Sequence, residues 1–346
     1  MELNWPKAHN PCLSYRDCDH CICDAYGAYQ FITAVSEFSK DPNRSAPSTL
    51  PSWEQEILRP RSPPIISYPH HEYDESDNPI TYSVSSFRSL AQTSIFLSRA
   101  DISALKNKTT GSKCATFDAV TSCLRRARTR TLINPKSNAR LIFPIDTRFR
   151  YKSLPNGYYG ATVVFPCAIT KAAKLVKEPL YYAAKLISEV KKDVGGDDYR
   201  ASVLDFIESN GRRGFYSEEA FVVSDMRCLR FNDVDFGWRR GVYGGPARAG
   251  TGMVPGMVTS VIGHKNEEGV EGVLALISLP PESLERLHKE RRTALLELEA
   301  KPEKEPDEQR ETEADLERKQ KEQPEMKPGA EKDSNREMLY ASRRTR

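Results

Sequence analysis

Apolar residues recur along residues 24–40 at the spacing of one helix face, as Tyr26, Tyr29, Ile32, Val35 and Phe38. A period of three to four residues predicts an amphipathic helix with one face packed on a core. The helix is expected to end at residue 41, because Pro42 follows. Residues 42–80 are rich in proline and serine and show little period, which predicts a semi-extended connector between two domains.

Beyond the connector, short apolar runs alternate with amphipathic stretches, and this alternation predicts a mixed α/β domain over residues 81–281. Strands are predicted over residues 83–97, 141–145, 161–165, 221–224 and 270–279. Helices are predicted from residue 99, over 116–130 with Thr116 as the N-cap, and over 168–192 and 198–209. Turns are expected between residues 241 and 256.

The last segment of the chain has a different composition. Residues 282–346 hold 34 charged side chains in 65 positions. A short helix is predicted over residues 285–299, but almost nothing apolar follows residue 301. Such a segment buries too little apolar surface to offset its ordering entropy, so it is predicted to be a solvated, disordered tail.

Charge and composition exclude several classes of protein. The first 281 residues carry a net charge of +5, which is too weak a field to favour a nucleic-acid partner. No run of 18 apolar residues occurs, so no membrane span is expected. The eight cysteines follow no secretion signal. They are therefore interpreted as reduced thiols in a cytoplasmic protein.

One cluster of cysteine and histidine residues resembles half of a zinc site. It consists of Cys18, His20, Cys21 and Cys23. A structural zinc ion needs four converging ligands, normally from two pairs, and no second pair of this kind follows along the chain. We therefore expect no metal site.

His20 and Asp24 form the pattern H-x-x-x-D directly before the first predicted helix. The pattern alone is weak, since His70 and Asp74 form it again. His20 lies at the entry of a helix, where packing can fix a side chain. His70 lies in the connector, where a base is not expected to be held as precisely as catalysis requires. His20 is therefore the candidate general base.

Two further segments combine turn residues with charged or aromatic ones. In residues 234–238, Val-Asp-Phe-Gly-Trp, Gly237 permits a tight turn, Asp235 can accept backbone N–H bonds, and Trp238 is expected to pack. Residues 154–160, Leu-Pro-Asn-Gly-Tyr-Tyr-Gly, form a predicted turn before a strand. Asp146 and Arg148 lie just upstream of that turn.

Together these segments resemble the plant BAHD family of acyl-CoA-dependent acyltransferases, in particular the branch that acylates alcohols such as benzyl alcohol. The family marks are H-x-x-x-D and D-F-G-W-G, which read H-C-I-C-D and D-F-G-W-R here. Further agreement, in the same order, comes from Trp53-Glu54 and residues 70–74, 157–160, 223–225 and 243–247. This resemblance runs from about residue 17 to residue 280. The chain departs from the family at Ala25, Ala161 and Arg239, where glycine, asparagine and glycine are usual.

The resemblance implies a chloramphenicol-acetyltransferase-like α/β fold of two domains with mixed sheets. Most strands of the family's first domain precede the histidine, whereas nineteen residues precede His20, so the first domain is expected to be mostly missing. The expected parts are a remnant of that domain at 1–41, the connector at 42–80, the second domain at 81–281 and the tail at 282–346. Exposed apolar surface is then expected around Tyr26, Tyr29 and Phe38.

The resemblance also implies transfer of an acyl group from acyl-CoA to an alcohol, with His20 as the general base. Asp24 is expected to pair with an arginine, for which Arg148 is the candidate, and Gly237 and Trp238 to give structural support. Asp235 is sometimes given a catalytic part in the family, although its motif is typical of a structural loop. Ser224 and Asp225 match a segment that lines the family's substrate channel.

The expected partners are acyl-CoA as co-substrate and a small alcohol as acceptor, with no permanently bound cofactor. The protein is expected to act as a monomer in the cytoplasm. The alternative hypothesis is a truncated, catalytically inactive member of the family that acts at most as an interaction protein.

Overall fold

The computed structural model describes residues 22–74, 90–109, 114–148, 154–194, 196–211, 213, 219–238, 243–246 and 256–289. The chain divides into two units, Met1–Ala300 and Lys301–Arg346. All of the described residues belong to the first unit. The predicted disordered tail from residue 301 lies outside them.

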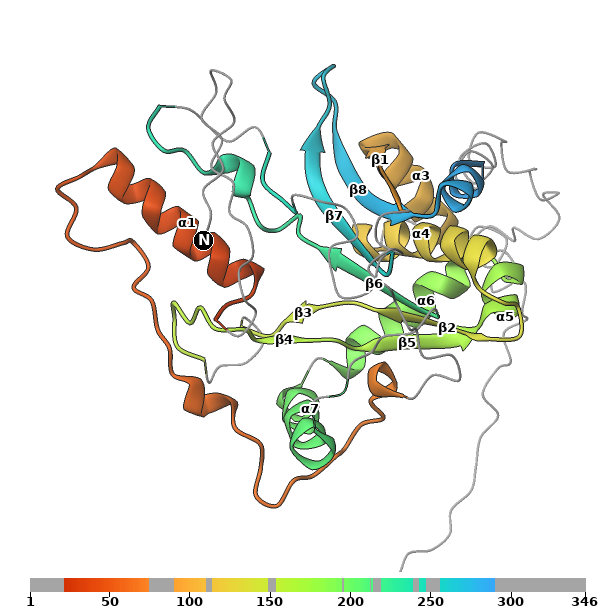
Figure 1. Cartoon of the computed structure of the whole chain (residues 1–346), viewed down its shortest axis with the longest axis horizontal. Helices are drawn as coiled ribbons and strands as arrows, with labels where there is room; N and C mark the ends of the chain where they lie inside the picture. The colour runs from red at the N-terminus through yellow and green to blue at the C-terminus, as the bar shows by residue number, and fades with distance from the viewer. Residues whose placement is uncertain are drawn as a thin grey trace, which may run out of the picture. The chain divides into compact units, whose positions relative to one another are not determined.

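A six-stranded mixed sheet organises this unit (Figure 1). The strands are β1 Ala91–Ser98, β2 Asn138–Ile142, β5 Cys167–Lys171, β6 Ala220–Asp225, β7 Val258–Lys265 and β8 Glu271–Leu279. Their order is β1-β8-β7-β6-β2-β5. The pairs β7–β6 and β6–β2 are parallel, and the other three neighbouring pairs are antiparallel. A separate ribbon pairs β3 Ile145–Asp146 with β4 Val163–Val164. The predicted mixed α/β class is confirmed.

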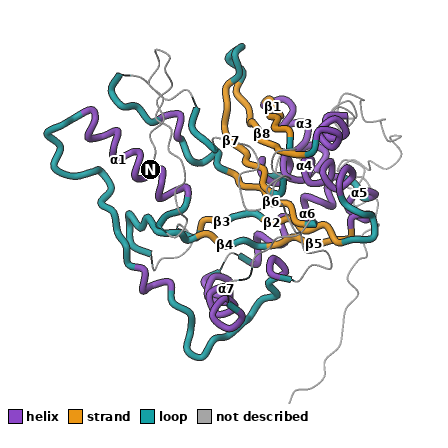
Figure 2. The backbone as a smooth tube through the Cα atoms, in the orientation of Figure 1, coloured by secondary structure: helices purple, strands orange, loops and turns teal. Residues whose placement is uncertain are grey.

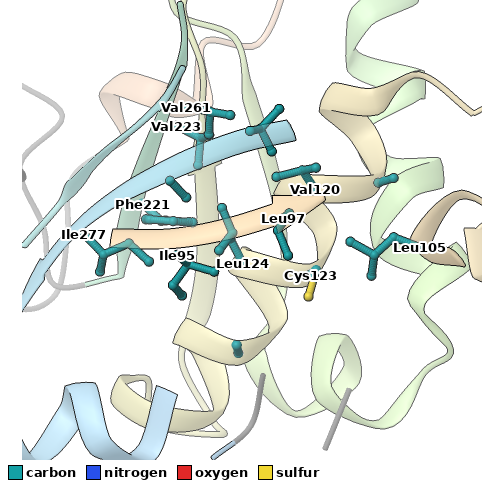
Figure 3. Close-up of a cluster of buried hydrophobic side chains, with 14 of the residues drawn as sticks. Ile95, Leu97, Leu105, Val120, Cys123, Leu124, Phe221, Val223, Val261 and Ile277 are labelled. Carbon is teal, nitrogen blue, oxygen red and sulfur yellow. The ribbon is translucent and has the colours of Figure 1, made fainter. Parts of the chain in front are cut away.

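Three helices pack on one face of the sheet (Figure 2). They are α3 Arg99–Thr109, α4 Thr116–Leu132 and α6 Leu180–Asp193. Two further helices follow β5 and α6 along the chain, α5 Ala172–Lys177 and α7 Asp197–Asn210 respectively. Alternate strand residues point to the same face, so Ile95, Leu97 and Val223 meet the helices. Figure 3 shows these side chains with Val120, Cys123 and Leu124 of α4 in one continuous core.

The first helix, α1 Ala25–Lys40, confirms the helix predicted over residues 24–40. Its N-cap is Asp24, whose side chain accepts hydrogen bonds from the backbone N–H groups of Tyr26 and Gly27. The connector follows. Its described part, residues 42–74, contains two short 3₁₀ turns, η1 Gln55–Leu58 and η2 His71–Tyr73, and an isolated β-bridge from Ser52 to Tyr158, as its composition predicts.

The expectation that His70 is poorly held was wrong. His70 is buried, and its Nδ1 lies 2.9 Å from Oε1 of Glu72 while its Nε2 lies 2.9 Å from Oγ of Ser202 on α7. Ser202 Oγ also accepts backbone N–H bonds from Ser67 and Tyr68. The connector is therefore fixed to α7, and both ring nitrogens of His70 are engaged with side chains of the fold.

The structure differs from the sequence prediction at several points, and the strand predicted over residues 141–145 is divided between β2 and β3. The helix predicted over 168–192 consists of strand β5 followed by α5 and α6, which are separated at Pro179 because proline cannot continue a helix. Strand β7 was not predicted. Thr116 is the first residue of α4, and its N-cap is Ala115. The last helix includes residues 281–289 rather than beginning at residue 285, and its Leu284 and Leu287 belong to the main core.

One face of α1 is uncovered. Phe31 is 55% exposed, and Val35 and Phe38 lie one and two turns further on the same face and are also exposed. The expectation of exposed apolar surface is confirmed for Phe38. By contrast, Tyr26 lies against the Arg148 guanidinium and Tyr29 packs edge-on against the ring of Phe231, so both are half-buried.

Among the residues that the structure describes, no helix is both long enough and apolar enough to cross a membrane.

Candidate active site

The candidate site is built around the start of α1, where the H-x-x-x-D motif ends at Asp24. His20, Cys18 and Cys21 lie outside the described residues. Asp24 is buried, and its carboxylate binds groups from two segments more than a hundred residues away in sequence. The last residue of the motif therefore connects the start of α1 to distant parts of the chain.

The predicted pairing of Asp24 with Arg148 is confirmed. Nη1 of Arg148 lies 2.8 Å from Oδ2 of Asp24, and Nη2 lies 2.8 Å from Oδ1, which is a bidentate arrangement. The backbone N–H of Thr162 donates to Oδ2 at 3.1 Å. The charged groups of the pair are both buried, so solvent screens their attraction little.

All five N–H groups of the Arg148 guanidinium have an acceptor. Besides the two bonds to Asp24, Nε donates to the carbonyl of Tyr158 at 2.9 Å, Nη1 to Oδ1 of Asp146 at 3.1 Å, and Nη2 to the carbonyl of Gly160. Burial alone would lower the pKa of Arg148, but its hydrogen bonds and the negative charges of Asp24 and Asp146 raise that pKa above its usual value. Arg148 therefore remains a cation.

The turn at residues 157–160, here called the aromatic turn, supports this pair from one side. Two of its carbonyls accept from Arg148, and a third, that of Gly157, accepts from Nε2 of Gln30 on α1 at 3.1 Å. Gly27 lies directly against the turn, because a Cβ at this position would be 2.1 Å from the carbonyl oxygen of Tyr159. Gly157 has a φ of 81°, a conformation that favours glycine.

The second motif lies at the other end of α1. Oδ1 of Asp235 accepts the backbone N–H of Gly237 at 2.9 Å, and Oδ2 lies 3.5 Å from Nζ of Lys40. Gly237 has a φ of 96°, as a tight turn requires. Trp238 does not pack as expected: it is 68% exposed, although its ring stacks on that of Phe236.

Ser224 and Asp225 end strand β6. In the sheet Ser224 is paired with Ser260 of β7. The carboxylate of Asp225 accepts from Nε and Nη2 of Arg227 at 2.8 and 2.6 Å and from its backbone N–H at 3.1 Å. Asp225 is thus committed to a local ion pair with Arg227, which the sequence analysis did not identify.

The structure brings together Asp24 and Arg148, and it places the Asp235 motif elsewhere. Since α1 has 16 residues and rises about 1.5 Å per residue, its two ends are about 24 Å apart. Asp146 and Thr162 were missed as partners of the pair. For Asp146 a signal existed, because an aspartate side chain often accepts the backbone N–H two residues on, and Oδ1 of Asp146 accepts that of Arg148 at 2.9 Å.

Sequence comparison shows what the chain is similar to. A family model described as Transferase family matches residues 17–294. Benzyl alcohol O-benzoyltransferase of Nicotiana tabacum is 39% identical over 276 residues, which cover 79% of this chain and 59% of that protein. Alcohol acyl transferase 2 of Malus domestica is 36% identical over 283 residues, with 79% and 59% covered. The chain thus spans about three fifths of the length of these relatives.

Solved structures with a similar fold include vinorine synthase, with a TM-score of 0.57 and 14% identity over 79% of this chain and 60% of that one. TRI101 of F. graminearum, solved with coenzyme A and deoxynivalenol, has a TM-score of 0.55 and 16% identity over 78% and 63% of the two chains. At these identities the likeness concerns the fold.

Proposed function

Because the chain belongs to the Transferase family, whose plant members are the BAHD acyltransferases, we propose that it catalyses O-acylation of a small alcohol with acyl-CoA as donor. The observation that carries the proposal is the buried, bidentate pair of Asp24 and Arg148, which ties the H-x-x-x-D motif to the rest of the unit. The similarity to alcohol acyltransferases favours this hypothesis over that of an inactive interaction protein.

In the proposed reaction His20 is the general base. An alcohol hydroxyl is a poor nucleophile at neutral pH, and a histidine with the ordinary pKa of about 6.5 can accept its proton as the oxygen attacks the thioester carbon. A C–O bond forms, the C–S bond then breaks, and the leaving thiolate takes the proton back from His20. The products are an ester and free coenzyme A, and no covalent acyl-enzyme is required.

Asp24 is proposed to position the residues around it and not to transfer a proton. Both of its carboxylate oxygens are occupied, by two guanidinium nitrogens and three backbone N–H groups. No lone pair remains free to orient an imidazole. Its proposed role is to fix the start of α1, and with it the residues that precede the helix. Arg148 is the partner in that role.

The Asp235 motif is proposed to be structural. Its carboxylate is engaged with Gly237 and Lys40 at the end of α1 about 24 Å from Asp24. A loop of this kind holds the C-terminal end of the helix, where Oγ of Ser39 also donates to the carbonyl of Phe236 at 3.0 Å. Ser224 and Asp225 remain candidates for the substrate channel.

A cytoplasmic location is proposed, and the buried free thiols of Cys114 and Cys167 agree with it. A monomeric state is proposed as well, and light scattering would measure it directly.

The test is a coenzyme A release assay with a panel that pairs benzoyl-CoA and short acyl-CoAs with benzyl alcohol and aliphatic alcohols. The wild-type chain should release thiol only when both substrates are present. His20→Ala should lower the rate by about 10²–10⁴-fold, the contribution of a general base. His71→Ala is the control, because its ring is exposed and bonded to Asp74 in the connector. Loss of activity in the control with full activity in His20→Ala would overturn the assignment.

A further inference from the structure

The connector contributes one aromatic side chain to the candidate site. The ring of Trp53 stacks on that of Tyr159, with centroids 5.0 Å apart and planes at 27°. It also lies parallel to the ring of Tyr158, with centroids 6.3 Å apart and planes at 2°. Trp53 is 40% exposed, so it covers the two tyrosines from the solvent side.

Backbone hydrogen bonds fix this stack in place. The N–H of Ser52 donates to the carbonyl of Gly157 at 2.9 Å, and the N–H of Tyr159 donates to the carbonyl of Ser52 at 3.3 Å. The ring also fits the turn closely, because a Cβ on Gly160 would be 2.9 Å from the Trp53 ring. Residues 52 and 53 therefore form one wall of the aromatic turn.

The same turn also binds α1 and the pair of Asp24 and Arg148. The carbonyl of Gly157 that binds Ser52 also accepts from Gln30 of α1. The carbonyls of Tyr158 and Gly160 accept from Arg148, which binds Asp24. The aromatic turn thus lies between the connector and α1, and a displacement of the turn would be passed to Arg148 and Asp24.

We propose that Trp53 is a positioning residue for acyl transfer: by stacking on Tyr158 and Tyr159 it fixes the aromatic turn, and through Arg148 and Asp24 it fixes the start of α1. The inference rests on the proposed function. It predicts that Trp53 affects the rate of the chemical step although it lies outside the predicted catalytic residues. A misplacement of a reacting group by about 1 Å is enough to lower a rate about a hundredfold.

The experiment compares Trp53→Ala, Trp53→Phe and the control Tyr181→Ala by steady-state kinetics with the best substrate pair from the panel. Tyr181 is an aromatic residue of similar exposure, 46%, on α6. We expect Trp53→Ala to lower kcat about 10–100-fold with KM for acyl-CoA changed less than about 3-fold. Trp53→Phe keeps a flat ring and should recover kcat to within about 5-fold of the wild type.

A double variant separates positioning from general destabilisation. If Trp53 acts through Arg148, then Trp53→Ala combined with Arg148→Lys should lower kcat little more than the more damaging single change, whereas independent effects would multiply. Circular dichroism at the assay temperature would establish that each variant is folded. Should Trp53→Ala not fold, Trp53→Leu, which keeps apolar volume but lacks the planar ring, is measured instead.

The two proposals fail in different ways. A wild-type chain with no activity on any substrate pair would refute the proposed function before any variant is made. An active wild type in which Trp53→Ala, or Trp53→Leu in its place, is as active as Tyr181→Ala would overturn the positioning role alone. Multiplicative effects in the double variant would also overturn it.

Discussion

Arg148 and Arg125 are two buried guanidinium groups in the same unit, and their surroundings differ. Arg148 has an acceptor for all five N–H groups and pairs with the carboxylate of Asp24. Arg125 on α4 is 1% exposed, and only its Nη2 is bonded, to the carbonyls of Ala139 and Ala168 at 2.9 and 2.7 Å. Its Nε and Nη1 have no partner among the described residues.

The difference shows that burial of a charge does not by itself indicate its effect on stability. Burial lowers the pKa of Arg125 to about 10, so it is still a cation at neutral pH. Among the described residues, no carboxylate is bonded to it. For Arg148, the hydrogen bonds and negative charges of Asp24 and Asp146 stabilise the cation by more than desolvation destabilises it, and its pKa is raised. We therefore expect the two arginines to respond to the same substitution with opposite signs.

Arg148→Met should have the largest effect. The change leaves the Asp24 carboxylate buried without its partner, which in buried pairs costs about 3–5 kcal/mol of unfolding free energy. The measurement is urea unfolding followed by circular dichroism, read as a lower midpoint at an unchanged slope. A midpoint equal to that of the wild type would contradict the role given to the pair.

Arg125→Met should stabilise the protein, by about 1–4 kcal/mol, because a well-packed apolar side chain replaces a desolvated cation. The same urea experiment measures it. Arg130→Met is the matched control on the same helix, since Arg130 is exposed and should change stability by less than about 0.5 kcal/mol. Destabilisation by Arg125→Met would contradict this expectation, because the two bonds from Nη2 to the carbonyls of Ala139 and Ala168 would then outweigh the desolvation of the cation.

Gly27→Ala tests the contact between α1 and the aromatic turn. The added Cβ would be 2.1 Å from the backbone oxygen of Tyr159, so the helix must move away from the turn. Alanine favours helix formation, yet we expect a net loss of about 1–3 kcal/mol from the overpacking. Gly263→Ala, where a Cβ would meet nothing within 4 Å, is the control. Stabilisation by Gly27→Ala would indicate a looser contact.

Asp235→Asn should have the smallest effect. The Asp235 and Lys40 side chains are both exposed and 3.5 Å apart, and asparagine can still accept the N–H of Gly237. Such pairs contribute about 0–1 kcal/mol, less at high salt. We expect a shift within this range that decreases in 0.5 M NaCl. A loss of unfolding free energy comparable to that of Arg148→Met would contradict this, because the Asp235 motif would then stabilise the fold as much as the pair of Asp24 and Arg148.

Local patterns of the sequence predicted several elements correctly for clear physical reasons. The apolar period indicated α1, and alternation of short apolar runs with helical stretches indicated the α/β class. Failures occurred where tertiary contacts decide. Residues 167–171 form strand β5 because they pair with β2, although the sequence pattern predicted that residues 168–171 begin a helix.

For the site, motifs and resemblance identified Asp24 and Arg148, but sequence could not show how fully the guanidinium is bonded. The carbonyls of Tyr158 and Gly160 are backbone groups, which no residue pattern identifies as acceptors. The anchoring of His70 by Ser202 was hidden for a similar reason, since its partner lies 132 positions away. Contacts over such separations depend on the fold as a whole.

A double-mutant cycle in unfolding free energy tests the central claim, that the aspartate of the H-x-x-x-D motif is held by Arg148. Asp24→Asn retains the N-cap oxygen but not the charge, and it is combined with Arg148→Met. The account predicts a coupling energy of about 2–3 kcal/mol between the two positions. A coupling below about 0.5 kcal/mol would contradict it, because the two side chains would then stabilise the fold independently.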